Sequence, residues 1–250
     1  IPRASSSAPW VVVMFPGLVI PMQVGRERSR AAVQEAVRRE RPIGVLLQVK
    51  PETDDAGPDD VHWVGTSAVV LRYVTTPDGI HHAVVSGQQR FRVLQFLEGW
   101  PFLVARVEFV PEEDESDTEI QGRGRALKQR AAEALELLPN VPDEMSTALQ
   151  GVTGAARLAD FIGGLMDSAP PEKQALLETF DLKTRLDKLL EILARRIEVL
   201  KVSREVDERT RESIGDMNRK HLLREQMRTI QKELGEEDED KADLADLEKA

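Results

Sequence analysis

The 250-residue sequence contains no cysteine and no long apolar run. Without cysteine, a disulfide framework and thiol chemistry are both excluded. No apolar stretch approaches the ~18 residues of a membrane-spanning helix. The first ten residues, IPRASSSAPW, lack the charged start and the apolar core of a signal peptide. These absences fit a reducing compartment, and we expect a cytoplasmic protein with no membrane partner.

Aromatic residues are scarce, and they are unevenly distributed together with the charges. Residues 1–110 hold nine of the eleven aromatic residues, with 12 Lys and Arg against 11 Asp and Glu. Residues 111–250 hold 22 basic and 33 acidic side chains, so most of the net charge of −10 lies there. This charge disfavours binding of nucleic acid by the whole surface. Residues 111–119, which begin with the acidic run PEEDESD, are predicted to link two different parts.

The first part, residues 1–110, has the pattern of several strands and one helix. The apolar run Trp10–Phe15 is predicted to be a buried strand that ends at Pro16-Gly17. A helix is predicted from Ser29 to Pro42. Further strands are predicted at residues 43–49, 61–73, 80–97 and 102–110, with a turn at Pro77-Asp78-Gly79. Within the third of these, Arg90 and Arg92 are expected to be exposed because they alternate with the apolar Phe91 and Val93. Consecutive strands with one helix favour a mostly antiparallel sheet or a small open barrel.

The second part is predicted to be entirely helical. Amphipathic segments at residues 120–138, 144–150, 155–166 and 172–180 are separated by proline or glycine. With the start of the next segment they are predicted to form a helical bundle over residues 120–200.

The last segment has the pattern of one unusually long helix. Asp181 is a plausible N-cap, and a helix over Leu182–Leu234 would be roughly 80 Å long. Its apolar stripe is dense up to Leu200 and sparse afterwards, so residues 201–250 are predicted to be an extended helix that needs a partner. Gly215 is predicted to interrupt it, because glycine costs about 1 kcal/mol relative to alanine in a helix.

Three blocks of sequence resemble the amino-terminal region of the Lon family of ATP-dependent proteases. The blocks are FPGLVIPMQVGRERS at residues 15–29, GTSAVVLRYVTTPDGIHHAVVSGQQRFRVLQF at 65–96 with PFLVARVE at 101–108, and RLADFI at 157–162 followed by EKQALLETFDLKTRLDKLLEIL at 172–193 and LREQMRTIQKELGE at 223–236. They cover nearly the whole chain in the correct order. The sequence departs from the family pattern at ASSSAPW, where a Leu/Pro-rich strand is usual, at His221-Leu222 and at Gly215.

The resemblance implies an α+β fold. A mostly antiparallel, β-rich PUA-like domain over residues 1–110 would precede the helical bundle and a long helix leading to an ATPase module. In the family, this region engages protein substrates and helps to organise a hexamer. The resemblance therefore implies two kinds of partner, which are unfolded or damaged proteins and other copies of the chain.

Catalytic motifs are missing from the 250 residues. They contain neither the phosphate-binding pattern G-x-x-x-x-G-K-[ST] nor a Ser-Lys peptidase block. The chain is therefore expected to be a non-catalytic fragment whose parent resembles an ATP-dependent serine endopeptidase. No cofactor is expected in the fragment, and ATP and Mg²⁺ are expected in the parent's missing module.

No catalytic residue and no metal ligand are assigned. His81 and His82 are adjacent on a predicted strand, so their side chains point to opposite faces and cannot chelate together. The acidic loop at residues 54–60 lacks the glycine and the final glutamate of a calcium loop.

Binding of unfolded protein requires an exposed apolar patch. Apolar residues at turns are the hardest to bury, and seven of them are predicted to contact protein substrates, with Met22 and Trp100 the strongest candidates. They are Phe15, Pro16, Leu18, Pro21, Met22, Trp100 and Phe102. The alternative is that each of these side chains belongs to the hydrophobic core.

Two other functions remain open. PUA-like domains often bind RNA, although the net charge of +1 over residues 1–110 gives this alternative little support. The chain could also be a structural coiled-coil spacer that acts through residues 201–250.

Overall fold

The computed structural model describes residues 12–111, 116–139 and 141–234. The chain divides into two compact units, Ile1–Arg196 and Ile197–Ala250. The strands and the first five helices belong to the first unit, which also includes the beginning of the last helix. The predicted β-rich part and the predicted bundle up to Arg196 therefore lie within one compact unit.

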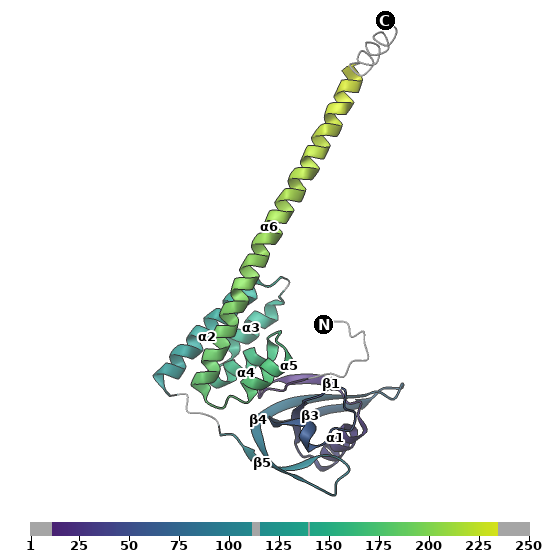
Figure 1. Ribbon diagram of the computed structural model, residues 1–250, viewed down its shortest axis with the longest axis vertical. Helices are drawn as coiled ribbons and strands as arrows, with labels where there is room; N and C mark the ends of the chain where they lie inside the picture. The colour runs from purple at the N-terminus through teal and green to yellow at the C-terminus, as the bar shows by residue number, and fades with distance from the viewer. Residues whose placement is uncertain (1–11, 112–115, 140, 235–250) are drawn as a thin grey trace. The chain divides into compact units, whose positions relative to one another are not determined.

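Five strands form an antiparallel sheet in the described part of the first unit (Figure 1). They are β1 (Val19–Gln23), β2 (Ile43–Gln48), β3 (Val61–Thr75), β4 (His81–Leu97) and β5 (Val104–Phe109). Their order is β1–β4–β3–β2, and β5 pairs with the second half of β4. The long β3–β4 hairpin turns at Gly79, whose φ of 80° lies in the left-handed region that glycine tolerates. The short helix η1 (Pro58–Asp60) lies between β2 and β3.

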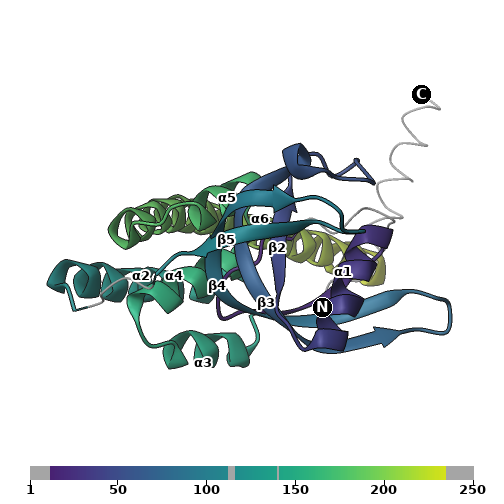
Figure 2. The ribbon, with the colours of Figure 1, turned by 90° about the horizontal axis from the view of Figure 1, so that it is seen from below.

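The sheet is curled, and helix α1 (Glu27–Arg39) packs on its concave side (Figure 2). The helix ends where Glu40 adopts the left-handed conformation, two residues before Pro42. A cluster of buried side chains joins the helix to the strands. It comprises Met14, Val24, Val33, Ala68, Ala83 and Val85.

Helices follow the sheet. They are α2 (Thr118–Leu137), α3 (Asp143–Gly151), α4 (Ala155–Leu165), α5 (Pro170–Leu177) and α6 (Leu182–Leu234). Asp117 caps α2, and the Asp181 carboxylate accepts a hydrogen bond from the Thr184 amide at the start of α6. The first turns of α6 bury one apolar stripe in the first unit, which consists of Leu182, Leu186, Leu189 and Leu193.

The antiparallel sheet followed by several helices confirms the predicted fold class, but two local predictions are wrong. The described part of the strand predicted at Trp10–Phe15 has no strand, and the first strand is β1 instead. Met14 and Phe15 are buried in irregular backbone, which is held where the Thr66 hydroxyl donates to the Met14 carbonyl oxygen at 2.6 Å. Trp10 lies outside the described residues.

The predicted interruption of the long helix at Gly215 is also wrong. The backbone of α6 is helical without a break from Leu182 to Leu234. One glycine costs about 1 kcal/mol, which a helix of this length absorbs. The predicted linker 111–119 overlaps the start of α2, while its residues 112–115 lie outside the described residues.

Candidate functional site

The outer face of the sheet, on the side away from α1, carries exposed apolar side chains. Directly paired residues of neighbouring strands share a face. Val85 is fully buried, and its paired residues Ile20 and Val70 are partly buried against the same core. Side chains alternate between the two faces of a strand, so the rows of paired residues before and after this row point outward. These rows are Val19–Ser86–Val69 and Pro21–Val84–Arg72, and the row Gln23–His82–Val74 follows.

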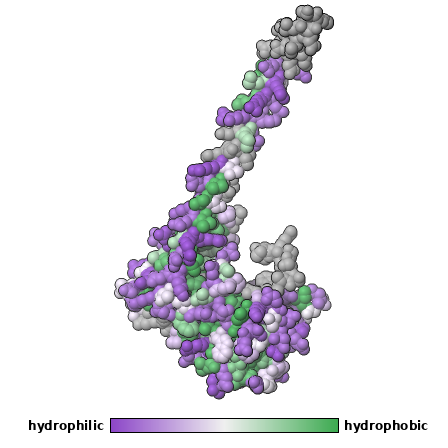
Figure 3. Space-filling model, in the orientation of Figure 1, coloured by the Kyte–Doolittle hydropathy of each residue, from purple (hydrophilic) through white to green (hydrophobic). Residues whose placement is uncertain are grey.

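We call this surface the outer apolar face. Its apolar members are Val19, Pro21, Val69, Leu71, Val74 and Val84. Leu71 is the extra residue of a β-bulge and is 58% exposed, and Val19 is 55% exposed. Five of these six residues are therefore open to solvent, and Val84 is half-buried. Figure 3 shows hydrophobic side chains at the surface of the strands.

Three of the residues predicted to contact substrate have roles inside the fold instead. Phe15 is only 1% exposed, so its prediction as a surface contact is wrong. Its ring lies against Gly163 of α4, where an added Cβ would be 3.2 Å away. Leu18 packs on Gly164 of the same helix, and Met22 is half-buried against the core on the side opposite the outer apolar face. The FPGL segment therefore joins the sheet to the bundle.

The other four predicted residues differ in accessibility. Pro21 is exposed and lies on the outer apolar face, and Pro16 is half-buried. Trp100 is exposed in the turn between β4 and β5, where its ring centroid is 6.2 Å from that of half-buried Phe102. A position in or near a turn therefore predicted exposure correctly for Pro21 and Trp100, whereas Pro16 and Phe102 are half-buried.

A second apolar surface lies on the concave side, beyond α1, and the sequence reasoning missed it. Phe91 is paired with Gly65 and with Phe109, so these residues share one face across β3, β4 and β5. At the same end of the sheet, Trp63 packs edge-on against Phe96, with 5.5 Å between ring centroids. We call Trp63, Phe91, Phe96 and Phe109 the concave aromatic face, in which Trp63 and Phe109 are exposed and Phe91 is buried. The available signal was the presence of aromatic residues in three successive predicted strands. Phe91 and Phe96 are five residues apart and share a face because of the register shift between Val93 and Gln95.

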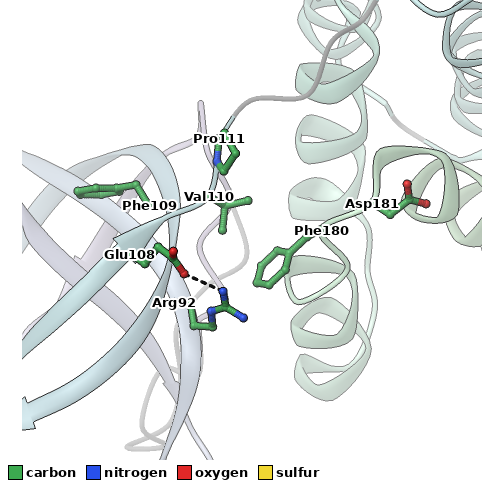
Figure 4. Close-up of a pocket in the computed structure, with 7 residues that line it drawn as sticks. All are labelled: Arg92, Glu108, Phe109, Val110, Pro111, Phe180 and Asp181. Atoms are coloured by element: carbon green, nitrogen blue, oxygen red, sulfur yellow. Dashed lines mark hydrogen bonds and ion pairs between the residues drawn. The ribbon is translucent and has the colours of Figure 1, made fainter.

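A pocket of about 350 Å³ lies between the sheet and the start of α6 (Figure 4). Its lining consists of Arg92, Glu108, Phe109, Val110, Pro111, Phe180 and Asp181. Arg92 donates to Glu108 at 2.7 Å and lies 6.0 Å from the centroid of the Phe180 ring, a cation–π distance. The close-up shows the Phe109 side chain pointing away from Phe180, as expected for a residue on the opposite face from Glu108.

A buried ion-pair network fixes the sheet to the helices. The guanidinium of Arg90 on β4 donates to both carboxylate oxygens of Asp160 on α4, with one distance of 2.8 Å. Arg185 of α6 lies 3.9 Å from the same carboxylate and donates to the Thr179 carbonyl oxygen at 2.7 Å. The expected exposure of Arg90 is wrong, because the bundle covers this part of the outer sheet face.

Ionisable groups near the helix starts have shifted pKa values with local causes. Lys183 contacts Asp117 at 2.6 Å and Glu119 at 3.0 Å. The hydrogen bonds from Lys183 lower the pKa of both carboxyl groups and raise the pKa of Lys183. Partial burial lowers the pKa of Lys173, whose ammonium donates to the Gly164 carbonyl oxygen. These groups tie helices together and do not line an enclosed site.

The described residues contain no group of three or more His, Asp or Glu side chains placed to hold a metal ion. His81 instead contacts the Tyr73 hydroxyl at 2.8 Å, and Asp55 of the acidic loop pairs with Arg28 at 2.6 Å. Over the residues that the structure describes, no helix is both long enough and apolar enough to cross a membrane.

Residues 10–195 match a known protein family. The matching family is described as the ATP-dependent protease La (LON) substrate-binding domain.

Curated proteins of similar sequence are Lon proteases. The Lon protease of Phenylobacterium zucineum (strain HLK1) is 45% identical over 239 residues, which are 95% of this chain and 30% of that protein. The Lon protease of Paraburkholderia phytofirmans (strain DSM 17436 / LMG 22146 / PsJN) is 46% identical with the same coverage. The chain thus spans about 30% of the length of these relatives.

Solved structures of similar fold are amino-terminal domains. The N-terminal domain of Mycobacterium avium complex Lon protease has a TM-score of 0.63 at 23% identity, and the match covers 73% of this chain and 93% of that one. A Lon N-terminal domain protein from Xanthomonas campestris has a TM-score of 0.51 at 22% identity, with 73% and 94% covered. At these identities the likeness shows the fold alone.

Proposed function

The chain belongs to the Lon protease family, as its substrate-binding region, and from this premise we propose that it binds unfolded or damaged proteins without catalysing a reaction. The observation that carries the proposal is the outer apolar face, because unfolded polypeptides present the apolar segments that folded proteins bury. No described helix or strand covers its exposed side chains.

The strength of a single contact supports a transient interaction. Complete burial of an exposed leucine side chain contributes roughly 1.5–3 kcal/mol to binding. Leu71 is just over half exposed, so its burial by a substrate contributes only part of this free energy. One such surface should therefore bind weakly. Several copies on one assembly would retain a substrate more strongly through effective concentration, without new contacts.

The test measures binding of a reduced and alkylated, permanently unfolded protein to the 250-residue chain. Leu71→Asp should weaken binding about tenfold, since it replaces an apolar contact with a charge and the exposed position tolerates the change. Val49→Asp is the matched control, because Val49 is also exposed but lies outside the outer apolar face. Equal effects of the two substitutions would remove the outer apolar face from the proposal.

We also propose that this region is non-catalytic. Neither a phosphate-binding loop nor a Ser-Lys peptidase block occurs in the sequence, and nucleotide and Mg²⁺ would act in other parts of the parent protein. A purified preparation should hydrolyse neither ATP nor peptide. ATPase activity that co-purifies with the chain through two further columns would contradict this.

A specific observation supports a second role, which is contact with other copies of the chain. In the second unit, α6 exposes apolar side chains with about half or more of their surface open. They include Val199, Val202, Val206, Met217, Leu222, Leu223, Met227 and Ile230. A helix with such a stripe gains stability by packing on another helix. We propose that copies of α6 pack together and help to organise the oligomer.

Sedimentation of the whole chain tests this role. Met227→Glu should lower the average mass at a fixed concentration, because it places a charge in the apolar stripe. Gln226→Glu adds the same charge one position away and should leave the mass unchanged. The role in assembly is contradicted if both variants sediment like the original chain.

A further inference from the structure

Strand β5 has one edge that no described strand pairs with. The Val110 amide donates to the Arg90 carbonyl oxygen at 3.0 Å. This bond shows which residues of β5 direct their backbone groups toward β4 and which direct them away. In an antiparallel pair, every second residue exchanges both backbone bonds with its partner. Glu108 therefore bonds to β4, while the N–H and C=O groups of Val107 and Phe109 point to the open edge. Among the described residues, these groups have no other hydrogen-bond partner.

The side chains beside this edge form a patterned surface. Phe109 is 49% exposed and ends the row that runs through Phe91, on the concave aromatic face. Val107 ends the next row on the same face, beside Val93. Glu108 points to the opposite face and is exposed. An added strand would meet an apolar residue, an acidic residue and an aromatic residue in turn.

The other two edges of the sheet are less suitable. On β1, the Val24 amide donates to His81, so the alternation places Pro21 on the open side. Proline has no N–H, and it blocks the centre of that edge. Strand β2, with the sequence IGVLLQ, carries no aromatic and no charged side chain. The edge of β2 has open backbone groups, but its side chains would give no preference for a charged or aromatic segment.

We propose that the open edge of β5 binds an extended segment of the unfolded polypeptide as an additional antiparallel strand. Apolar or aromatic residues of the segment lie opposite Val107 and Phe109, and a lysine or arginine lies opposite Glu108. Backbone bonds at the edge supply affinity for any sequence, and the alternating side chains supply preference. This inference rests on the proposed function and adds the conformation and the chemical pattern of the bound segment.

The alternation makes the proposal testable without knowledge of the register. Residues opposite Val107 and Phe109 would point their N–H groups at β5, whereas the basic residue opposite Glu108 would point its N–H away. A fluorescein-labelled nine-residue peptide with Val and Phe alternating with Lys and Thr serves as the probe. Its binding to the 250-residue chain is measured by fluorescence anisotropy.

Two N-methylated versions of the peptide form a matched pair. Methylation of the amides of the apolar residues should weaken binding at least tenfold, because the edge-facing N–H groups are lost and the methyl groups collide with β5. Methylation of the amides of the Lys and Thr residues should change binding less than threefold. Equal weakening by the two patterns overturns the edge proposal.

A charge exchange tests the direction of the side chains. Glu108→Lys should weaken binding of the lysine peptide several-fold, and replacing the peptide lysines by glutamate should restore it. Absence of this restoration overturns the proposed pairing at Glu108. The reduced and alkylated protein is measured in parallel: if it binds while the peptide fails, only the edge proposal is overturned, and if neither binds, the proposed function is overturned as well.

Discussion

Removal of the buried Asp160 carboxylate should destabilise the first unit strongly. The Arg90 and Asp160 side chains are 8% and 5% exposed, and they form a two-point ion pair between β4 and α4. Asp160→Asn keeps the shape of the side chain but leaves the Arg90 charge without its counterion. Breaking a buried pair in this way costs about 3–5 kcal/mol. Because whole domains are stable by about 5–15 kcal/mol, this loss is large.

Urea unfolding of the 250-residue chain measures the effect. Trp63 and Trp100 report on the sheet through fluorescence, and circular dichroism at 222 nm reports on the helices. If Arg90–Asp160 joins the two parts, both signals should shift to lower urea in the Asp160→Asn variant. The Arg90→Met/Asp160→Leu double variant should lose less stability, since it removes both charges from the interior.

The exposed ion pair between Arg92 and Glu108 provides the control. Both side chains are more than half exposed, so Glu108→Gln should cost less than about 1 kcal/mol. If Asp160→Asn costs no more than Glu108→Gln, water reaches the Arg90 guanidinium and the reasoning from burial is refuted.

Two further predictions concern the core and the pH dependence. Phe15→Ala should cost about 3–5 kcal/mol in urea unfolding, while binding of unfolded protein by the folded fraction stays unchanged; a loss of binding at full stability would show a contact with substrate instead. The hydrogen bond from Lys183 lowers the pKa of Asp117 below its ordinary value of 3.8, so the stabilisation is present above pH 3.8 and is lost as the pH falls through the lowered pKa. Acid titrations should therefore show a smaller loss of stability in Asp117→Asn than in the original chain, and identical profiles would contradict the assignment.

The sequence predicted elements whose signals are local. The leucine spacing predicted the buried apolar stripe at the start of α6, and Pro77-Asp78-Gly79 marked the turn of the β3–β4 hairpin. Phe91 and Val93 were predicted to be buried from their alternation, and both are. Such patterns depend on the geometry of one element, so the sequence is sufficient to reveal them.

The candidate surfaces depended on pairing between distant segments. Pro21 was predicted to be exposed and is, but its neighbours Val69 and Leu71 are 48 and more residues away, and only the strand register places them beside it. Phe15 and Met22 have the same apolar character as exposed residues. Their burial is decided by α4 and by the strands that happen to cover them.

The sequence by itself determined most of the helices and strands, their order and the division of charge, because the periodicity of an element is a pattern among neighbouring residues. Only the tertiary structure decided which apolar side chains remain in solvent and which edge of the sheet stays open. Arg90 and Arg92 show the difference, since both have the alternation of an exposed strand position. The bundle packs over Arg90 and supplies Asp160, whereas Arg92 stays exposed, because burial is a property of what folds against a residue and not of the residue itself.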